Sequence, residues 1–320
     1  MLDIHQLHIF LTAAETLSFT RTAQRLHMTQ PSVSQHIQAL ERHFGCELFV
    51  RNGRNLELTD AGLKLAAFAQ EAVLLSARIE SEMASLNRGV VGHLIIGCCT
   101  TPGKYILPKL LTSFHDQYPR VRITCNVLHQ QDAIKLLLEG KLHFTLTSLV
   151  DDLTPELESV RFICDRLVLI APSSHPWAQK GEIEADQLLE GRFILRESES
   201  GSYAAIRNAL ATKEISIHEL DTILTLGNSE AIALSVHEGL GVGFVSEKVI
   251  EYLGMKDVAV IKIRGLEIER DIFITRNRRQ PSTLAQTTFW EYLFSPKNPF
   301  RLCDNEIVNL AMDRGVYERN

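Results

Sequence analysis

Three short helical patterns and a hairpin signal follow one another at the N-terminus, and this order constrains the fold more than any other feature of the sequence. Over residues 2–14 the apolar side chains recur with the spacing of one helix face. Ser18 suits the N-cap of a second helix over 19–26. A third helix is predicted over 30–44, because Pro31 fits a first helical turn, where a missing N–H costs nothing. This succession is typical of a helix-turn-helix.

The dipeptide Asn52-Gly53 separates two short strand-like runs, 48–51 and 54–58. Asn-Gly favours a β-hairpin because both residues tolerate the positive φ that the tight turn requires. Adding this hairpin to the three helices predicts a winged helix-turn-helix, a DNA-binding domain, over residues 1–60. The alternative is a generic three-helix subdomain whose polar face is only solvated.

The formal net charge of −6 argues against a polybasic protein, but the charge is unevenly distributed. Between Arg21 and Arg54 there are five arginines and only two acidic residues. Polar side chains on the third helix can hydrogen-bond base edges and phosphates of double-stranded DNA, and the hairpin arginines can reach the backbone or the minor groove. The candidate DNA-contacting residues are Arg21, Thr29, Gln30, Pro31, Ser32, Ser34, Gln35, Gln38, Arg51 and Arg54.

A long helix is predicted after the hairpin, from Thr59 or Asp60 to about residue 87. Its apolar residues advance by four and three positions through Ala61, Leu65, Phe68, Ala72, Leu75 and Ile79, with Leu86 one heptad further on. This spacing is typical of a helix that pairs with a copy of itself. The alternative is a core helix of a larger domain, because its other faces are apolar too. A protein that binds two DNA half-sites favours the homodimer.

Strand and helix patterns alternate after a hinge at residues 88–92. A first series over 93–147 has the order strand, helix, strand, helix, strand, which implies a parallel sheet covered on both faces. A second series occupies 167–245, and a strand over 268–275 with a helix over 283–293 is predicted to return to the first lobe. The predicted fold class is α/β: a two-lobed, periplasmic-binding-protein-like sensor domain that binds ligands between its lobes.

A chain of 320 residues is too long for one ordinary core, so several domains are expected. No apolar run reaches the roughly 20 residues of a membrane span, and the N-terminus lacks the features of a signal peptide. A cytoplasmic protein with no membrane partner is therefore expected. The predicted parts are the winged helix-turn-helix (1–60), the dimerisation helix and hinge (61–90), lobe I of the effector-binding domain (91–164 and 267–300), lobe II (165–266) and a C-terminal tail (301–320).

Three predicted strands of the sensor end in hydroxyl or amide side chains just before a helix. A helix N-terminus presents free N–H groups and partial positive charge, so such loops can hold a carboxylate, phosphate or sulfate. The alternative is that these side chains only cap their own helices. The candidate effector-binding residues are Thr100, Thr101, Ser200, Ser202 and Asn228 in these loops, with Thr147 and Ser148 at the end of a further strand.

The run SFTRTAQRLHMTQPSVSQHIQALERHFGCELFVRNGRNLELTDAG (18–62) resembles the winged helix-turn-helix of the LysR-type transcriptional regulators nearly position by position. Similar segments in the sensor are TPGKYILPKLLTSFHDQYP (101–119), HPWA (175–178), ILRESESGS (194–202) and NSEAIALSVHEGLGVGFVS (228–246). The resemblance covers about residues 1–295 and extends to regulators of sulfur, nitrogen or inorganic carbon assimilation. It implies a dimer or tetramer, a DNA target with dyad symmetry, an effector cleft between the lobes, and RNA polymerase as a candidate partner.

Two departures from the family pattern affect the expected effector. Cys99 stands where relatives often carry serine, and the loop RESES around Glu199 adds a carboxylate and lacks an arginine that relatives often have. If Glu197 and Glu199 face the gap between the lobes, they favour a cation, a zwitterion or an amide over an anion. Cys98 and Cys99 allow a thiol redox sensor as one interpretation, and small apolar strand residues as the other.

Other function classes are less well supported. A solute-binding protein with an extra N-terminal domain would not need the hairpin arginines. An enzyme is disfavoured because the sequence has no Gly-rich phosphate loop and no GxSxG motif, and the GLGVG run at 239–243 follows a helix rather than a strand. No cofactor and no metal site are expected, since His5 and His8 have no third ligand with suitable spacing. The predicted function is transcriptional regulation through a small-molecule effector, an anionic metabolite.

Overall fold

The computed structural model describes residues 2–52, 55–148, 155–300 and 307–308. The chain forms two compact units, one of residues 1–92 with 279–287 and one of residues 93–278 with 288–320. Each unit has its own hydrophobic core, and the two are described separately. Among the described residues, no helix combines the length and the hydropathy that crossing a membrane requires.

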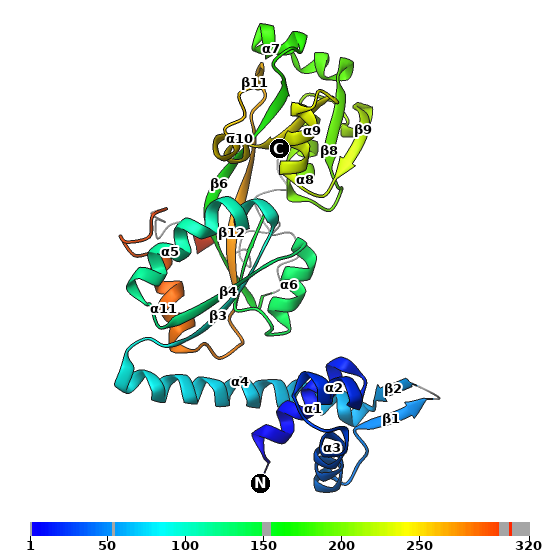
Figure 1. The fold of residues 1–320 in the computed structure, drawn as a ribbon, viewed down its shortest axis with the longest axis vertical. Helices are drawn as coiled ribbons and strands as arrows, with labels where there is room; N and C mark the ends of the chain where they lie inside the picture. The colour runs from blue at the N-terminus through cyan, green and yellow to red at the C-terminus, as the bar shows by residue number, and fades with distance from the viewer. Residues whose placement is uncertain (1, 53–54, 149–154, 301–306, 309–320) are drawn as a thin grey trace. The chain divides into compact units, whose positions relative to one another are not determined.

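The N-terminal unit is a winged helix-turn-helix followed by one long helix (Figure 1). Its helices begin where side chains can cap them: the Ser18 side chain accepts a hydrogen bond from the backbone N–H of Arg21, and Thr29 accepts one from that of Ser32. The third helix ends at Gly45, whose φ of 69° is the left-handed conformation that favours glycine. The elements are α1 (Ile4–Thr16), α2 (Phe19–Arg25), α3 (Gln30–Phe44), the hairpin strands β1 (Phe49–Asn52) and β2 (Asn55–Leu58), and α4 (Asp60–Arg88).

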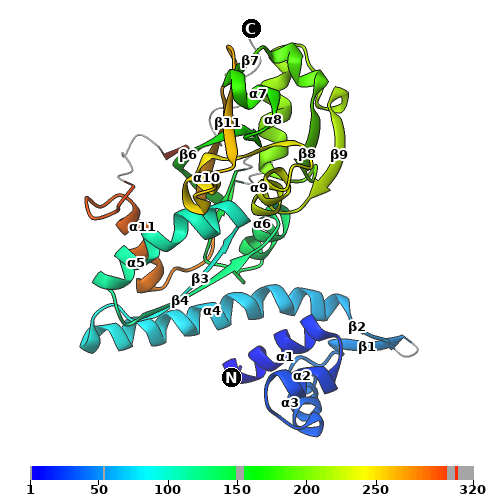
Figure 2. The same cartoon turned by 45° about the horizontal axis from the view of Figure 1, so that its top comes forward.

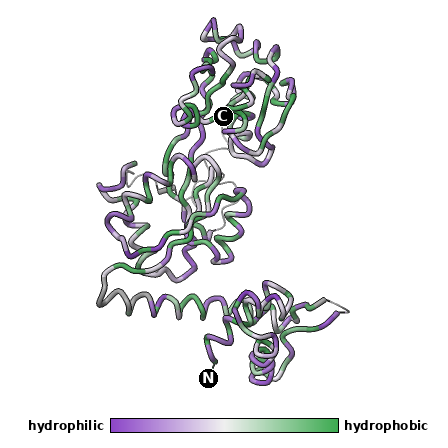
Figure 3. The backbone as a smooth tube through the Cα atoms, in the orientation of Figure 1, coloured by the Kyte–Doolittle hydropathy of each residue, from purple (hydrophilic) through white to green (hydrophobic). Residues whose placement is uncertain are grey.

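The apolar stripe of α4 divides between two environments. Ala61, Leu65 and Ala72 pack against the core of the winged helix-turn-helix, so this half of the predicted seam is used within the unit. In the same stripe, Phe68 between them is 69% exposed, and Leu75 and Ile79 beyond them are 49% and 56% exposed. Figure 3 shows that hydrophobic and hydrophilic residues alternate along the described part of the helix. The sequence did not distinguish the two halves, because residues packed on a neighbouring core have the same spacing as residues of an intermolecular seam.

The sensor unit is a continuous sheet shared by two lobes, and its strands run in the order β4-β3-β5-β12-β6-β10-β8-β9 (Figure 2). Lobe I contains β3 (Gly92–Cys98), η1 (Pro102–Ile106), α5 (Leu107–Gln117), β4 (Val121–Val127), α6 (Gln130–Leu138), β5 (Phe144–Thr147) and α11 (Leu284–Leu293). Lobe II contains α7 (Pro176–Lys180), β7 (Glu182–Ile183), β8 (Arg192–Arg196), α8 (Gly201–Ala211), β9 (Asp221–Leu226), α9 (Ser229–His237), β10 (Val242–Ser246), α10 (Glu247–Leu253) and β11 (Val258–Ile263).

Two long strands, β6 (Leu157–Pro172) and β12 (Ile268–Asn277), run through both lobes as an antiparallel pair. Their pairing runs from Ile268 opposite Leu167 to Asn277 opposite Leu157, with a register shift between Ile272 and Phe273. The α/β two-lobed fold predicted from the sequence is confirmed. The sheet is mixed, however, and β6 begins ten positions before the predicted start at 167, because the crossing strand extends through a stretch that has no simple alternation.

Close packing of helices on the sheet explains why buried strands carry glycine. At Gly243 in β10, an added Cβ would lie 2.6 Å from the Ile232 side chain and 3.0 Å from the Ile194 carbonyl oxygen. Helix α9 therefore lies directly on the strand. This close packing explains a glycine of the GLGVG run without a dinucleotide site. Figure 3 shows that hydrophobic residues gather along the central strands of each lobe. In the tail, residues 301–306 and 309–320 lie outside the described part, and β13 (Ile307–Val308) pairs with β6.

His143 in lobe I should make the stability of the sensor depend on pH. Its Nδ1 accepts a hydrogen bond of 3.1 Å from the backbone N–H of Ile95, which requires the neutral ring. Burial, and then the nearby charge of His93, lower the pKa of His143 to about 4. Because the unfolded chain binds a proton near pH 6.5 and the folded chain does not, stability falls as the pH decreases from about 6.5 to 4. For this half-buried ring the expected loss is roughly 1 to 2 kcal/mol at pH 5.

The matched variant is His143→Asn, whose amide oxygen can take the place of Nδ1 and does not titrate. Urea unfolding followed through the fluorescence of Trp290, which is buried in lobe I, reports the stability of this lobe. Wild type should lose more stability than the variant between pH 7 and pH 5. Parallel losses in the two proteins would show that His143 does not cause the pH dependence.

Candidate functional site

One candidate surface is the polar face of α3 together with the hairpin. Gln35 and Gln38 are exposed on the helix, and the preceding Ser34 is half-exposed. Val33, Ile37 and Leu40 on the opposite face are buried in the core of the unit, so α3 is held firmly while its polar side faces outward. A helix with exposed amide and hydroxyl groups can donate hydrogen bonds to base edges and accept them.

The other described residues predicted to contact DNA lie in α2, at the start of α3 and in β1. Gln30 and Arg51 line a shallow cavity of about 170 Å³ with the start of α2. The guanidinium of Arg21 donates a hydrogen bond to the Thr16 carbonyl oxygen, and Thr29 is used as the cap of α3, with Pro31 and Ser32 in its first turn. Arg54 lies outside the described residues. The structure therefore brings α3 and Arg51 together on one unit, while Arg21 and Thr29 also have structural roles.

The second candidate site is a cavity of about 180 Å³ between the two lobes of the sensor. Its walls come from the ends of β3, β5 and β8, from the starts of η1, α6 and α8, and from the centre of β12. The lining residues are Cys99, Thr100, Thr101, Pro102, Val127, Leu128, His129, Gln130, Ser148, Arg196, Glu197, Glu199, Ser200, Gly201, Gly227, Arg270 and Ile272. The cavity lies at the ends of strands, where a two-lobed α/β domain is expected to bind its ligand.

Four of the seven predicted effector-binding residues line this cavity: Thr100, Thr101, Ser148 and Ser200. The side chain of Ser200 also caps α8, with a hydrogen bond of 3.1 Å from the backbone N–H of Tyr203. Thr101, by contrast, makes no capping hydrogen bond to η1. The capping interpretation therefore accounts for Ser200 but leaves the Thr101 hydroxyl for another role.

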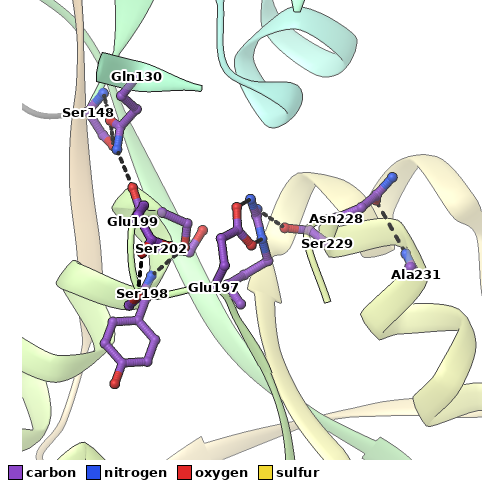
Figure 4. Close-up of polar contacts among 12 residues, drawn as sticks. Gln130, Ser148, Glu197, Ser198, Glu199, Ser202, Asn228, Ser229 and Ala231 are labelled. Carbon is purple, nitrogen blue, oxygen red and sulfur yellow. Dashed lines mark hydrogen bonds and ion pairs between the residues drawn. The ribbon is translucent and has the colours of Figure 1, made fainter. Parts of the chain in front are cut away.

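The remaining three predicted residues lie outside the lining. Ser202 is 1% exposed, and its hydroxyl accepts a hydrogen bond of 2.9 Å from Arg270. Asn228 caps α9, because its amide oxygen accepts hydrogen bonds from the backbone N–H groups of Glu230 and Ala231 at 2.7 and 3.3 Å. Thr147 is fully buried. Figure 4 shows Ser202 and Asn228 beside the polar residues at the cavity.

Two arginines of the lining were not predicted from the sequence. Arg270 lies in β12 directly opposite Asp165 in β6, and its Nε and Nη2 donate to Asp165 Oδ2 at 2.9 and 2.8 Å. The hydroxyl of Ser246 donates to the other oxygen of Asp165 at 2.6 Å. No clear signal in the sequence marks this pair, because both strands carry several charged residues. This buried pair fixes Arg270 at the joint between the lobes.

Arg196 forms the second pair. Its Nη2 and Nε donate to the two carboxylate oxygens of Glu197 at 2.6 and 2.7 Å, and its Nη1 donates to the Ser229 hydroxyl at 3.3 Å. Burial raises the pKa of Glu197, but the hydrogen bonds from Arg196 and from the Glu197 backbone, together with the charges of Arg196 and His129, hold that pKa below its usual value. Glu199 is exposed at the edge of the cavity, where its carboxylate accepts a hydrogen bond from Ser198.

Contacts from lobe I to lobe II close the cavity on two sides. Gln130 Nε2 donates to the Glu199 carbonyl oxygen at 3.3 Å, and Gln130 Oε1 accepts from the Ser148 hydroxyl at 2.9 Å (Figure 4). On the other side Glu230 pairs with Lys104 at 2.5 Å and accepts a hydrogen bond from Tyr105. Burial and this acceptor raise the pKa of Tyr105, which keeps it a donor. These contacts join the two lobes on either side of the cavity.

The cysteines at the cavity are poorly suited to thiol chemistry. Burial, followed by the charges of Cys125 and Cys99, raises the pKa of Cys98 to about 12, and burial raises the pKa of Cys99 to about 11. Redox-sensing thiols need a lowered pKa and access to solvent. Cys98 is buried, with its Sγ 3.6 Å from the Asn126 carbonyl oxygen. These observations favour small apolar strand residues over a redox pair.

Comparisons with known proteins match both parts of the chain. Residues 4–63 match the family described as bacterial regulatory helix-turn-helix protein, lysR family, and residues 87–295 match the LysR substrate binding domain. An uncharacterized HTH-type transcriptional regulator of Methanocaldococcus jannaschii is 31% identical over 89% of this chain and 96% of its own length. A probable RuBisCO transcriptional regulator of Thalassiosira pseudonana is 31% identical over 92% of this chain and 98% of its own.

Solved structures agree with these matches. Full-length CbnR in complex with its target DNA has a TM-score of 0.61 at 22% identity, covering 91% of this chain and 99% of that one. The regulatory domain of Synechocystis CcmR in complex with 2-PG has a TM-score of 0.57 at 25% identity, covering 63% of this chain and 95% of that one. The likeness to CbnR supports the fold of both parts, and the likeness to CcmR concerns the sensor.

Proposed function

The chain belongs to the LysR family of helix-turn-helix transcriptional regulators, and on that premise we propose which surface binds DNA and which cavity binds the effector. It is a DNA-binding regulator modulated by a small molecule, and not an enzyme. We infer that α3 and Arg51 contact a promoter, and that a small anionic metabolite binds between the lobes. The observation that carries the second inference is the cavity lined by Thr100, Thr101 and Ser148 from lobe I and by Ser200 from lobe II.

The chemistry of the cavity supports an oxyanion ligand. Thr101 brings a hydroxyl donor from lobe I, and Gly201 begins α8, whose first backbone N–H groups carry partial positive charge. The CcmR regulatory domain is described in complex with 2-PG, and its sensor is 25% identical to this one. A metabolite anion of this size is therefore the first candidate for this chain.

A ligand that touches both lobes can regulate because it binds one lobe arrangement more tightly than another. Only such differential affinity shifts an equilibrium that the DNA-binding domains can sense. The lobes approach most closely where Gly201 faces Ser148, since a Cβ at Gly201 would overlap the Ser148 hydroxyl. Closing of the lobes around the anion is accordingly the step that we propose to couple to DNA binding. Homodimers or tetramers and contact with RNA polymerase are further proposals, which rest on the family resemblance.

Replacing Thr101 by valine should weaken effector binding without disturbing the fold. Valine has the shape of threonine, and the Thr101 hydroxyl caps no helix, so the variant removes one hydrogen bond to the ligand. We expect the Kd for 2-phosphoglycolate, measured by calorimetry on the full chain, to rise by about fivefold for a neutral bond and by up to about a hundredfold for a charged one.

The matched control is Thr112→Val on the exposed side of α5, which should bind like wild type. Equal affinities of Thr101→Val and wild type for a ligand that both bind would place the effector elsewhere. Binding of none of the proteins to 2-phosphoglycolate would reject that class of anion.

A further inference from the structure

The cavity between the lobes has arginines in its wall, but a carboxylate of the protein already occupies each of them. Arg270 is paired with Asp165, and Arg196 is paired with Glu197. Among the described lining residues, the two arginines are matched by two glutamates, Glu197 and Glu199, and no lysine is present. An anionic ligand therefore meets no arginine that is free of a protein carboxylate. One of the two ion pairs must open before the ligand can bind an arginine along its Nε–Nη2 edge.

The two pairs differ in how firmly the carboxylate is held. The side chain of Asp165 is 1% exposed, and it is bound by both Arg270 and the Ser246 hydroxyl. Moving the Asp165 carboxylate out of this position would leave the buried charge of Arg270 without its counter-charge, which is strongly unfavourable. The side chain of Glu197 is 20% exposed, and Arg196 is the only other residue among those described whose side chain donates a hydrogen bond to it. Glu197 can therefore turn towards solvent, whereas Asp165 cannot.

We propose that Glu197 is an internal competitor that the carboxylate of the effector replaces on Arg196, so that this residue selects small molecules bearing a carboxylate. The inference deepens the proposed function, since it rests on an anion binding in this cavity. A ligand carboxylate reproduces the two parallel N–H···O bonds that Glu197 now accepts, and the buried guanidinium keeps a partner throughout. A second polar group of the ligand then reaches Thr101 and the start of α8.

This arrangement has a consequence for specificity. A neutral ligand cannot replace a charged carboxylate on a buried arginine, because it would leave the guanidinium without a counter-charge. Glu197 itself stays ionised at neutral pH: burial raises its pKa, but its hydrogen bonds and the charges of Arg196 and His129 together hold that pKa below the usual value. Glu197 thus excludes uncharged metabolites from Arg196. It also lowers the affinity for the carboxylate ligand, so that the regulator responds only at higher ligand concentrations.

The test is calorimetry of the full chain with 2-phosphoglycolate as the probe. Glu197→Gln keeps the length of the side chain and removes its charge, so the probe should bind about tenfold more tightly or better. Glu199→Gln is the comparison variant: it removes the same charge from the same loop at the cavity, but Glu199 accepts its hydrogen bond from Ser198 rather than from an arginine. Its loss should tighten binding by the general charge effect alone, and so clearly less than Glu197→Gln does. In an Arg196→Gln background, Glu197→Gln should give no further gain.

Other outcomes would contradict displacement. Equal gains in Glu197→Gln and Glu199→Gln would indicate a general charge effect, and weaker binding by Glu197→Gln would make Glu197 a direct ligand contact, as for a zwitterion. If Glu197→Gln does not fold, Glu197→Asp is the deciding variant, because its shorter side chain weakens the ion pair with Arg196 while keeping the charge. Glu197→Asp should bind the probe more tightly than wild type does. Unchanged or weaker binding would reject displacement. If wild type and all variants fail to bind the probe, the anion site itself is rejected. If wild type binds the probe and Thr101→Val weakens binding, the anion site stands, and the Glu197 variants then decide whether displacement occurs.

Discussion

Replacing Leu75 and Ile79 by aspartate is expected to turn the chain into a monomer at micromolar concentration. These residues lie on α4 with half of their surface exposed, four positions apart, and Phe68 continues the same stripe one heptad earlier. In a homodimer each aspartate would be buried against an apolar partner, which costs several kcal/mol per pair and exceeds what a helix seam of this length contributes. Light scattering coupled to size exclusion gives the mass directly. Wild type should have at least twice the chain mass of 36.0 kDa.

The matched control for this variant is Leu63→Asp. Leu63 is 58% exposed on the same helix, but it lies off the seam of four-three steps. This variant should remain associated, because its charge would face solvent in the dimer. A monomeric wild type, or loss of association in Leu63→Asp as well, would show that the stripe of α4 does not hold two copies together.

Changing Ser34, Gln35 and Arg51 to alanine is expected to abolish sequence-specific DNA binding. Each base contact contributes about 1 to 3 kcal/mol, so losing the helix contacts together with the hairpin arginine should lower the affinity at least about a hundredfold. Removing Arg51 alone should instead weaken all sequences alike and reduce the salt dependence by about one phosphate contact. Fluorescence anisotropy on fragments of the upstream region, at several salt concentrations, separates the two effects.

Arg78→Ala provides the charge control, because Arg78 is an exposed arginine on α4 away from the polar face of α3. It should leave specific binding unchanged. If the triple variant still prefers the wild-type site over a scrambled one, then α3 is not the recognition helix. Stability should be little affected, since all three replaced side chains lie outside the buried core.

Local signals predicted the N-terminal unit well. Ser18, Pro31 and Gly45 each specify a helix end through their own backbone or side-chain chemistry, and the structure has α2 and α3 beginning and ending accordingly. The sensor was harder, because its two crossing strands pair residues about a hundred positions apart. Nothing near residue 157 shows that β6 will pair with β12, since the pairing depends on the whole lobe rather than on a local pattern.

The candidate site shows the same division. Hydroxyl residues that begin helices are visible in a sequence, and so Thr101 and Ser200 were predicted as ligand residues. Whether such a hydroxyl already has a hydrogen-bond partner depends on residues distant in the chain. Arg270 of the crossing strand β12, for example, donates a hydrogen bond to the Ser202 hydroxyl. The pairing of Arg196 with the adjacent Glu197 was also invisible, because adjacent residues on a strand normally point to opposite faces.

Titrating the full chain onto its own upstream DNA, with and without 2-phosphoglycolate, tests the central claim most directly. The account predicts that the ligand changes the affinity or the length of the protected DNA for wild type. At the same ligand concentration Thr101→Val should respond much less, although it binds DNA alone as wild type does. Identical titrations with and without a ligand that calorimetry shows to be bound would contradict the coupling, and equal affinity for scrambled DNA at moderate salt would contradict specific recognition.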